Sequence, residues 1–346
     1  MDNEGPRSTI AKPKGALTGH EENCLSHARL VPCLVIALAL AACSGASSDN
    51  SANSAASPGA AGSAAPGGKV IGVSIQDREA QFYQDMEAGM QAEAKKDGYT
   101  LIVVDANRDN AKQQSQVEDF ISKKVDAIVL TPFDSNAIGS AIVEANNANI
   151  PVFTADIANA SAQGKVISHI ASDNVQGGSQ AGKLMCAAVG NTGSVAILDE
   201  PEVTSVQDRV KGFKAALAQF CPNVKIVADP DSGGNRDKAN SDMGDILQAH
   251  KDLKGVFGIN DDSALGAVTA IKAAGLTGKV AVVGYDAGPE ARAAIATGAM
   301  YGDAIQYPAK IGSQTIDAIR DNFAGKTPPA KIATPTGTFT QADAKK

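Results

Sequence analysis

Short apolar runs alternate with longer amphipathic segments over most of this chain. Four runs rich in Val, Ile, Leu and Ala come first, at 69–75, 100–106, 126–132 and 150–156. Between them, apolar residues recur every three or four positions, which predicts helices over 82–98, 110–125 and 136–149. Near-continuous apolar strands separated by helices are typical of a parallel sheet covered on both faces.

The same alternation restarts after Ser172. The predicted helices of this second half are 174–189, 208–220, 236–250 and 263–275. Its predicted strands are 194–200, 224–230, 254–260 and 280–286. The chain therefore reads as an α/β protein with two successive sheets.

One segment of each half has the same layout. Residues 128–156 and 256–286 both read as a strand, an Asp-Ser pair, a helix of small residues, a second strand and a terminal aspartate. This similarity predicts two related lobes. The terminal aspartates, Asp156 and Asp286, have no packing role at the end of a buried strand. Because ligands bind beyond the carboxyl ends of parallel strands, we expect both carboxylates to face one cleft.

Size and charge narrow the possibilities. The chain has 346 residues, 43% of them hydrophobic, which is enough for two domains with their own cores. Its formal net charge is −7, and no run of Lys or Arg forms a basic stripe. We therefore expect no nucleic-acid partner.

The N-terminal part indicates export. Residues 30–42 are apolar and follow Arg29, a length that suits a signal peptide better than a membrane-spanning helix. Leu40-Ala41-Ala42-Cys43 is similar to the bacterial lipobox, in which cleavage precedes a cysteine that then carries lipid. A general secretory signal is the alternative. We expect 1–42 to be an N-terminal extension and lipoprotein signal peptide. The exported chain would be anchored by lipid at Cys43 and face the periplasm or the cell exterior.

A tether is expected next, over 43–68. In 44–68, 20 of 25 residues are Ser, Ala or Gly, a composition that cannot bury a core. Beyond it only two cysteines remain, Cys186 and Cys221. They could form a disulfide in an oxidising compartment or be two independent thiols.

Four motifs carry a family resemblance. They are "SHIASDNVQGG" at 168–178, "GINDDSALGA" at 258–267, "VVGYDA" at 282–287 and "AIQYPAKIG" at 304–312. From about residue 70 onward the chain resembles the periplasmic ribose-binding protein family, the substrate-binding components of ABC sugar importers. The resemblance implies two doubly wound parallel-sheet lobes joined by a three-strand hinge, the type I periplasmic-binding-protein fold. The N-lobe would comprise 69–170 plus 307–335, and the C-lobe 171–306 plus 336–346.

The resemblance also implies a ligand site. Carboxylates suit pairs of sugar hydroxyls, amides both donate and accept, and aromatic rings cover the C–H face of a sugar. Phe82 and Tyr83 could instead be core residues, and Asn260 could only begin a helix. The expected ligand-binding residues are Gln76, Arg78, Phe82, Tyr83, Asp156, Ile157, Gln207, Asn235, Asn260, Asp286 and Gln306.

Some positions depart from the ribose pattern. The family's ribose binder has arginine where this chain has Ile157 and Gln207, and an aromatic residue near Gly234. Two fixed cationic groups and a stacking ring are therefore expected to be missing, with Arg78 and Arg236 as partial replacements. Another pentose, a hexose or a polyol is as good a candidate ligand as ribose.

The expected function is that of an extracytoplasmic solute-binding lipoprotein. It would capture a monosaccharide or polyol between its lobes and deliver it to the permease of an ABC importer. A protein that presents bound sugar to a chemoreceptor or sensor kinase is the alternative. We expect a monomer without metal or cofactor.

An enzyme is disfavoured. Only His169 and His250 follow the predicted signal peptide, without metal-ligand spacing, and the chain has no G-x-S-x-G nucleophile motif. A sugar-responsive repressor would need a helix-turn-helix where the export signal lies.

Overall fold

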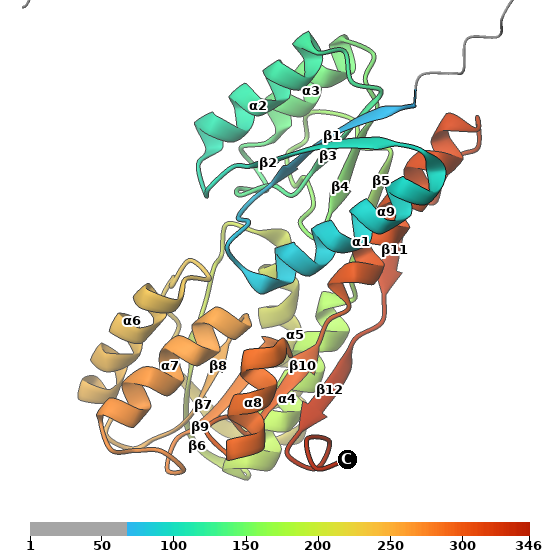
Figure 1. The fold of residues 1–346 in the computed structure, drawn as a ribbon. Coiled ribbons are helices and arrows are strands. Elements are labelled where there is room, and N and C mark those ends of the chain that lie inside the picture. The colour runs from blue at the N-terminus through green and yellow to red at the C-terminus, as the bar shows by residue number, and fades with distance from the viewer. Residues whose placement is uncertain (1–67) are drawn as a thin grey trace, which may run out of the picture. The chain divides into compact units, whose positions relative to one another are not determined.

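The structure, a computed structural model, describes residues 68–346, which form two six-stranded sheets flanked by helices (Figure 1). Each apolar run becomes a strand because both faces of its sheet are covered, so side chains of either direction are buried. The predicted signal peptide, Cys43 and the tether up to residue 67 lie outside the described residues.

The N-lobe sheet is entirely parallel, in the order β11-β5-β4-β3-β1-β2. Its strands are β1 (Val70–Ile75), β2 (Thr100–Asp105), β3 (Ala127–Leu130), β4 (Val152–Ala155), β5 (Ser168–Ser172) and β11 (Lys331–Thr334). Its helices are α1 (Gln81–Asp97), α2 (Asn110–Ser122), α3 (Gly139–Asn147) and α9 (Pro308–Phe323). Helix α1 packs on α9 and α2 on α3, which gives one hydrophobic core on each face of the sheet.

The C-lobe sheet has the order β12-β10-β9-β8-β6-β7, and only β12 runs antiparallel to its neighbour. Its strands are β6 (Thr192–Leu198), β7 (Asn223–Ala228), β8 (Leu253–Gly258), β9 (Ala281–Asp286), β10 (Gly302–Ile305) and β12 (Gly337–Thr340). Its helices are α4 (Asn174–Val189), α5 (Thr204–Phe220), α6 (Arg236–Ala249), α7 (Asp261–Ala273) and α8 (Pro289–Thr297).

The expected fold class, the type I periplasmic-binding-protein fold, is confirmed by the two doubly wound sheets and the helices that flank them. The chain passes between the lobes three times: from β5 into α4, from β10 into α9, and from β11 into β12. The residue bounds of the two lobes stay a prediction.

A disulfide joins Cys186 of α4 to Cys221, the residue that ends α5. It ties together two helices that already pack closely on the same face of the C-lobe sheet. Of the two alternatives that the sequence left open for these cysteines, the structure has the bonded one.

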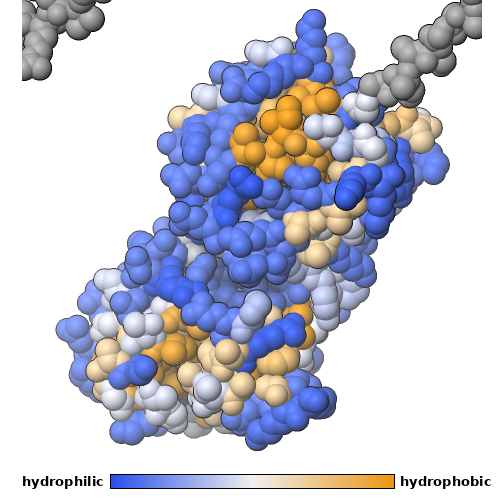
Figure 2. Space-filling view, in the orientation of Figure 1, coloured by the Kyte–Doolittle hydropathy of each residue, from blue (hydrophilic) through white to orange (hydrophobic). Residues whose placement is uncertain are grey.

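The surface is mainly hydrophilic, with an apolar patch over the N-lobe where β1 and β2 run (Figure 2). Strand β2 lies at the edge of its sheet, so Leu101, Ile102 and Val103 stay only half-buried. Within residues 68–346, no helix combines the length and the apolar character that a membrane crossing requires.

Candidate functional site

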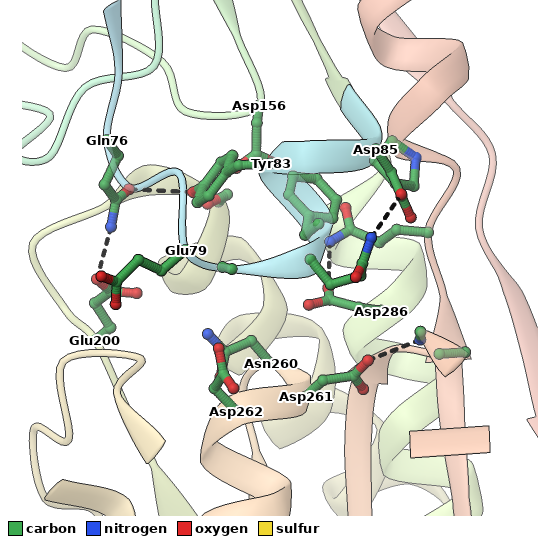
Figure 3. A pocket seen from close by; sticks show the side chains of 18 of the residues that line it. Gln76, Glu79, Tyr83, Asp85, Asp156, Glu200, Asn260, Asp261, Asp262 and Asp286 are labelled. Atoms are coloured by element: carbon green, nitrogen blue, oxygen red, sulfur yellow. Dashed lines mark hydrogen bonds between the residues drawn. The ribbon is translucent and has the colours of Figure 1, made fainter. Parts of the chain in front are cut away.

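A cavity of about 730 Å³ lies where the two lobes meet, and both lobes supply its walls. Figure 3 shows Gln76, Tyr83 and Asp156 of the N-lobe on one side and Asn260, Asp261 and Asp262 of the C-lobe on the other. Of the residues predicted from the sequence, the cavity brings together Gln76, Phe82, Tyr83, Asp156, Ile157, Asn260, Asp286 and Gln306.

The two strand-end aspartates share an unusual backbone. Asp156 follows β4 with φ of 63°, and Asp286 ends β9 with φ of 115°. Residues other than glycine rarely adopt positive φ, and such conformations concentrate at functional sites. The same device in both lobes directs a carboxylate away from the strand end and into the shared cavity.

A relay of polar groups runs along one wall of the cavity. The Tyr83 hydroxyl lies 3.3 Å from Asp156 Oδ2 and 3.2 Å from Gln76 Oε1. Gln76 Nε2 then donates to Glu200 Oε1 over 3.1 Å. Because Glu200 belongs to the C-lobe, this relay connects the two lobes through side chains alone.

Arg209 is a buried cation of the C-lobe that reaches the N-lobe. Its Nη2 lies 3.9 Å from Asp156 Oδ1, with both side chains at most 5% exposed. Its Nε donates to Asn174 Oδ1 and its Nη1 to the Ile259 carbonyl, each over 2.9 Å. The guanidinium also lies 4.2 Å from the centre of the Tyr285 ring, a cation–π distance.

The close packing of α4 on α5 positions Arg209. A Cβ added at Gly178 would lie 1.9 Å from the Arg209 carbonyl oxygen, and one at Gly212 would lie 2.2 Å from the Val175 carbonyl oxygen. Any larger residue at either position would force the helices apart. Glycine at the contact therefore holds the Arg209 backbone against α4 and the guanidinium at the cavity.

Arg108 makes the opposite connection, from the N-lobe to the C-lobe. It follows β2 and donates through Nε to Asp77 over 3.0 Å. Its Nη1 hydrogen-bonds the Gly233 carbonyl and lies 3.4 Å from Glu200 Oε1. Two arginines thus cross between the lobes in opposite directions.

Three predicted ligand contacts do not reach the cavity wall. Arg78 pairs with Glu87 of α1 over 2.8 Å on the surface of the N-lobe, away from the cavity wall. Gln207 is exposed and donates to the Pro201 carbonyl over 2.8 Å. Asn235 accepts from two amides of the first turn of α6, so its side chain serves as a helix cap.

The expectation that fixed cationic groups would be missing is wrong. Arg209, two residues beyond Gln207, occupies the buried face of α5 between Val206 and Phe213. A charged residue at helical spacing within an apolar stripe was a signal that could have identified it. Glu200 ends the predicted strand 194–200, so the strand-end rule that singled out Asp156 and Asp286 could have identified it. For Arg108 no such signal was available, because its cavity contacts are with residues of the other lobe.

The alternative roles of core packing for Phe82 and Tyr83 and of helix capping for Asn260 are both found in the structure. Asn260 does cap α7, accepting from the Ser263 amide over 2.8 Å, while its Nδ2 donates to the Gly234 carbonyl over 3.0 Å. Tyr83 belongs to the N-lobe core, and the Phe82 ring packs edge-on against it at 5.2 Å. All three side chains nevertheless line the cavity.

Burial shifts the acid–base behaviour of the wall. It raises the pKa of Asp156, although the Arg209 charge opposes this, and it raises the pKa of Glu200 to about 7 against the opposing charges of Arg108 and Arg209. In both groups, burial disfavours the charged form of the carboxyl.

Asp261 and Asp303 lie close to Asp286 and form a group of buried carboxyls with it. Both oxygens of Asp303 on β10 are buried without a hydrogen-bond donor, and Asp261 is their neighbour. Burial, and then the Asp261 charge, raise the pKa of both Asp303 and Asp286 well above the usual range, and burial raises that of Asp261 to about 6. Carboxyls that share one buried site ionise one at a time, so these three side chains titrate as a group.

The described part of the chain holds no group of three or more His, Cys, Asp or Glu side chains arranged for a metal ion.

Two α/β lobes that direct carboxylates, amides and an aromatic ring into one cavity define a ligand-binding protein. The chain belongs to the periplasmic binding protein domain family, whose model matches residues 71–327. This membership confirms the expectation of an extracytoplasmic binding protein and not an enzyme.

Individual relatives agree with the family match. The chain is similar to the ribose import binding protein of Bacillus subtilis, with 35% identity over 272 residues, covering 78% of this chain and 87% of the relative. It is 30% identical to a xylitol-binding protein of Mycolicibacterium smegmatis, covering 76% of each chain. A solved solute-binding protein of Actinobacillus succinogenes with bound D-allose has a TM-score of 0.75 and 30% identity, covering 80% of this chain and 99% of the other.

The group of Asp261, Asp286 and Asp303 predicts a pH-dependent stability. A carboxyl with a raised pKa in the folded protein stabilises it fully below its unfolded pKa near 4, and this contribution is lost as pH rises through the folded pKa. We expect the unfolding temperature to fall as pH rises from about 6 to 8.5. Asp303→Asn should make that fall shallower. The slope of its free energy of unfolding against pH should be smaller by up to about 1.4 kcal/mol per pH unit.

The measurement is calorimetric unfolding across this pH range. Asp245→Asn, at an exposed position of α6, is the matched control and should leave the slope unchanged. Parallel curves for the wild type and Asp303→Asn would show that Asp303 does not carry the pH dependence.

Proposed function

We propose that this protein captures a monosaccharide or polyol between its two lobes and delivers it to the permease of an ABC importer. The observation that carries the proposal is the meeting of Asp156 and Asp286, from two different sheets, in one cavity with amide and aromatic neighbours. Pairs of adjacent hydroxyls suit such carboxylates, and Phe82 offers a ring edge or face to the C–H groups of a sugar. The ribose, xylitol and D-allose named for the similar proteins support this ligand class.

The unpaired acceptors of the wall favour a hydroxyl-rich ligand. Asp156 Oδ1 and Gln306 Oε1 are buried without a hydrogen-bond donor among residues 68–346. Gln306 Nε2 meanwhile donates to Asp286 Oδ1 over 2.7 Å, which leaves its own carbonyl free to accept. A buried acceptor without a donor costs free energy, and the hydroxyls of a bound sugar would remove that cost.

The mechanism follows from contacts that exist only when the lobes meet. Arg108 and Arg209 each hydrogen-bond or pair across the boundary, and the ligand would add further bridges between Asp156 and Asp286. Ligand binding then favours the closed form over an open one in which the strand ends are exposed to water. The closed form is the one that we expect to dock on the permease.

Lipid anchoring at Cys43 is the second part of the proposal. Its support is the apolar segment 30–42 followed directly by cysteine, together with a tether of small residues long enough to separate the binding protein from a membrane. An anchor of this kind would keep the protein close to its permease.

The ligand class is tested by isothermal titration against a panel of pentoses, hexoses and polyols. Asp156→Asn and Asp286→Asn should each weaken binding about 10- to 100-fold, because each replaces one acceptor oxygen of the carboxyl with an amide nitrogen that can only donate. The exposed Asp245→Asn should bind as the wild type does. Absence of binding to the whole panel would refute the proposal, and wild-type affinity in either variant would remove that residue from the site.

The anchor is tested by growing the native host with a fatty-acid analogue and following its incorporation. The wild type should be labelled and recovered with membranes, whereas Cys43→Ser should be unlabelled. Equal labelling of both forms, or of neither, would contradict lipidation at Cys43.

A further inference from the structure

Glu200 is one of several carboxylates that line the cavity, and it lies at the end nearest Gln76. It follows β6 and is only 5% exposed. Its Oε1 accepts from Gln76 Nε2 over 3.1 Å and lies 3.4 Å from Arg108 Nη1. Its Oε2 accepts no hydrogen bond from the described residues, and Glu200 lines the cavity (Figure 3).

The loop before α6 makes room for that oxygen. Gly234 has φ of +57°, and a Cβ added there would lie 2.6 Å from Glu200 Oε2 and 3.0 Å from Asn260 Nδ2. Arg108 and Asn260 both hydrogen-bond the Gly234 carbonyl, at 3.5 and 3.0 Å, which keeps the loop in place. Any side chain at 234 would displace the carboxylate from its position at the wall.

The cations of the cavity are already engaged by protein groups. Arg209 is held by Asn174 and the Ile259 carbonyl, and Arg108 by Asp77 and the Gly233 carbonyl. The same holds for the other two arginines of the wall.

Arg236 pairs with Asp262 at 2.9 Å and with Glu290 at 2.8 Å. Arg292 donates to the Ala287 carbonyl and lies 4.7 Å from the Phe339 ring centre. Arg292 is thus held only by neutral groups, beside Ala287. At the other end of the cavity, Arg108 lies 3.4 Å from Glu200 and is already paired with Asp77, so its charge is compensated there while Glu200 presents an acceptor.

We propose that Glu200 determines ligand specificity, accepting hydroxyls at one end of a neutral sugar or polyol and rejecting ligands that carry an acid group there. This inference rests on the proposed function of sugar or polyol binding. Rejection arises because an acid group would be desolvated beside a carboxylate without a free cation, and like charges placed together at a binding site cost several kcal/mol.

The test is made at about pH 8.5, where Glu200, whose pKa burial raises to about 7, is ionised. It compares neutral ligands with their acids by isothermal titration: D-ribose with D-ribonate, D-allose with D-allonate, and xylitol with D-xylonate. For whichever neutral ligand binds, the wild type should bind the acid at least about 100-fold more weakly. Glu200→Gln keeps the length of the side chain and removes its charge. It should bind the neutral ligand about tenfold more weakly and reduce the discrimination against the acid at least about tenfold.

Two further variants separate charge from reach. Glu200→Asp keeps the charge but withdraws the carboxylate, so neutral binding should weaken while discrimination is kept. Glu202→Gln makes the same chemical change two residues away, outside the cavity wall, and should behave as the wild type.

Unchanged discrimination in folded Glu200→Gln, or wild-type affinity for the neutral ligand in Glu200→Asp, would overturn the inference. So would equal binding of neutral and acid forms by the wild type. If the wild type bound no neutral ligand at all, the proposed function itself would fail, which is a distinguishable result.

Discussion

The buried pair of Arg209 and Asp156 is the constraint on which the rest of the site depends. A guanidinium from the C-lobe and a carboxylate from the N-lobe are both withdrawn from water, 3.9 Å apart. Burying two charges costs more than their attraction returns unless further hydrogen bonds complete each group. Asn174, Ile259 and Tyr285 complete the arginine, but Asp156 keeps one oxygen without a donor. In the proposed function a hydroxyl-rich ligand would supply the missing donor, which would couple closure of the lobes to binding.

The need to complete each buried charge with hydrogen bonds also explains why the cavity is polar but is not built to bind a free cation or anion. Each arginine of the wall donates to protein acceptors. Burial raises the pKa values of the neighbouring carboxyls Asp261, Asp286 and Asp303. What faces the ligand is a set of acceptors and amides in fixed positions, with an aromatic ring alongside. We therefore expect a neutral molecule with many hydroxyls to satisfy such a wall better than a charged one.

Sequence patterns predicted the fold and the strand-end aspartates because both follow from short-range rules. Apolar runs, helical spacing and the carboxyl ends of parallel strands are local or topological features, and Asp156 and Asp286 occupy such ends. Gln207 was predicted in place of Arg209, two residues further along. The loop before α5 leaves open which residue of that helix matches the family's contact position. Glu200 was missed although it ends the predicted strand 194–200 and so carries the same strand-end signal. Arg108 was missed because its role depends on contacts with the other lobe, which no local pattern encodes.

The most direct test of the central claim is a crystal structure of the protein with a sugar or polyol selected by titration. A single ligand should lie in the cavity with hydroxyl oxygens within about 3.2 Å of both Asp156 and Asp286. A ligand bound outside this cavity, or one that touches only one lobe, would contradict the account.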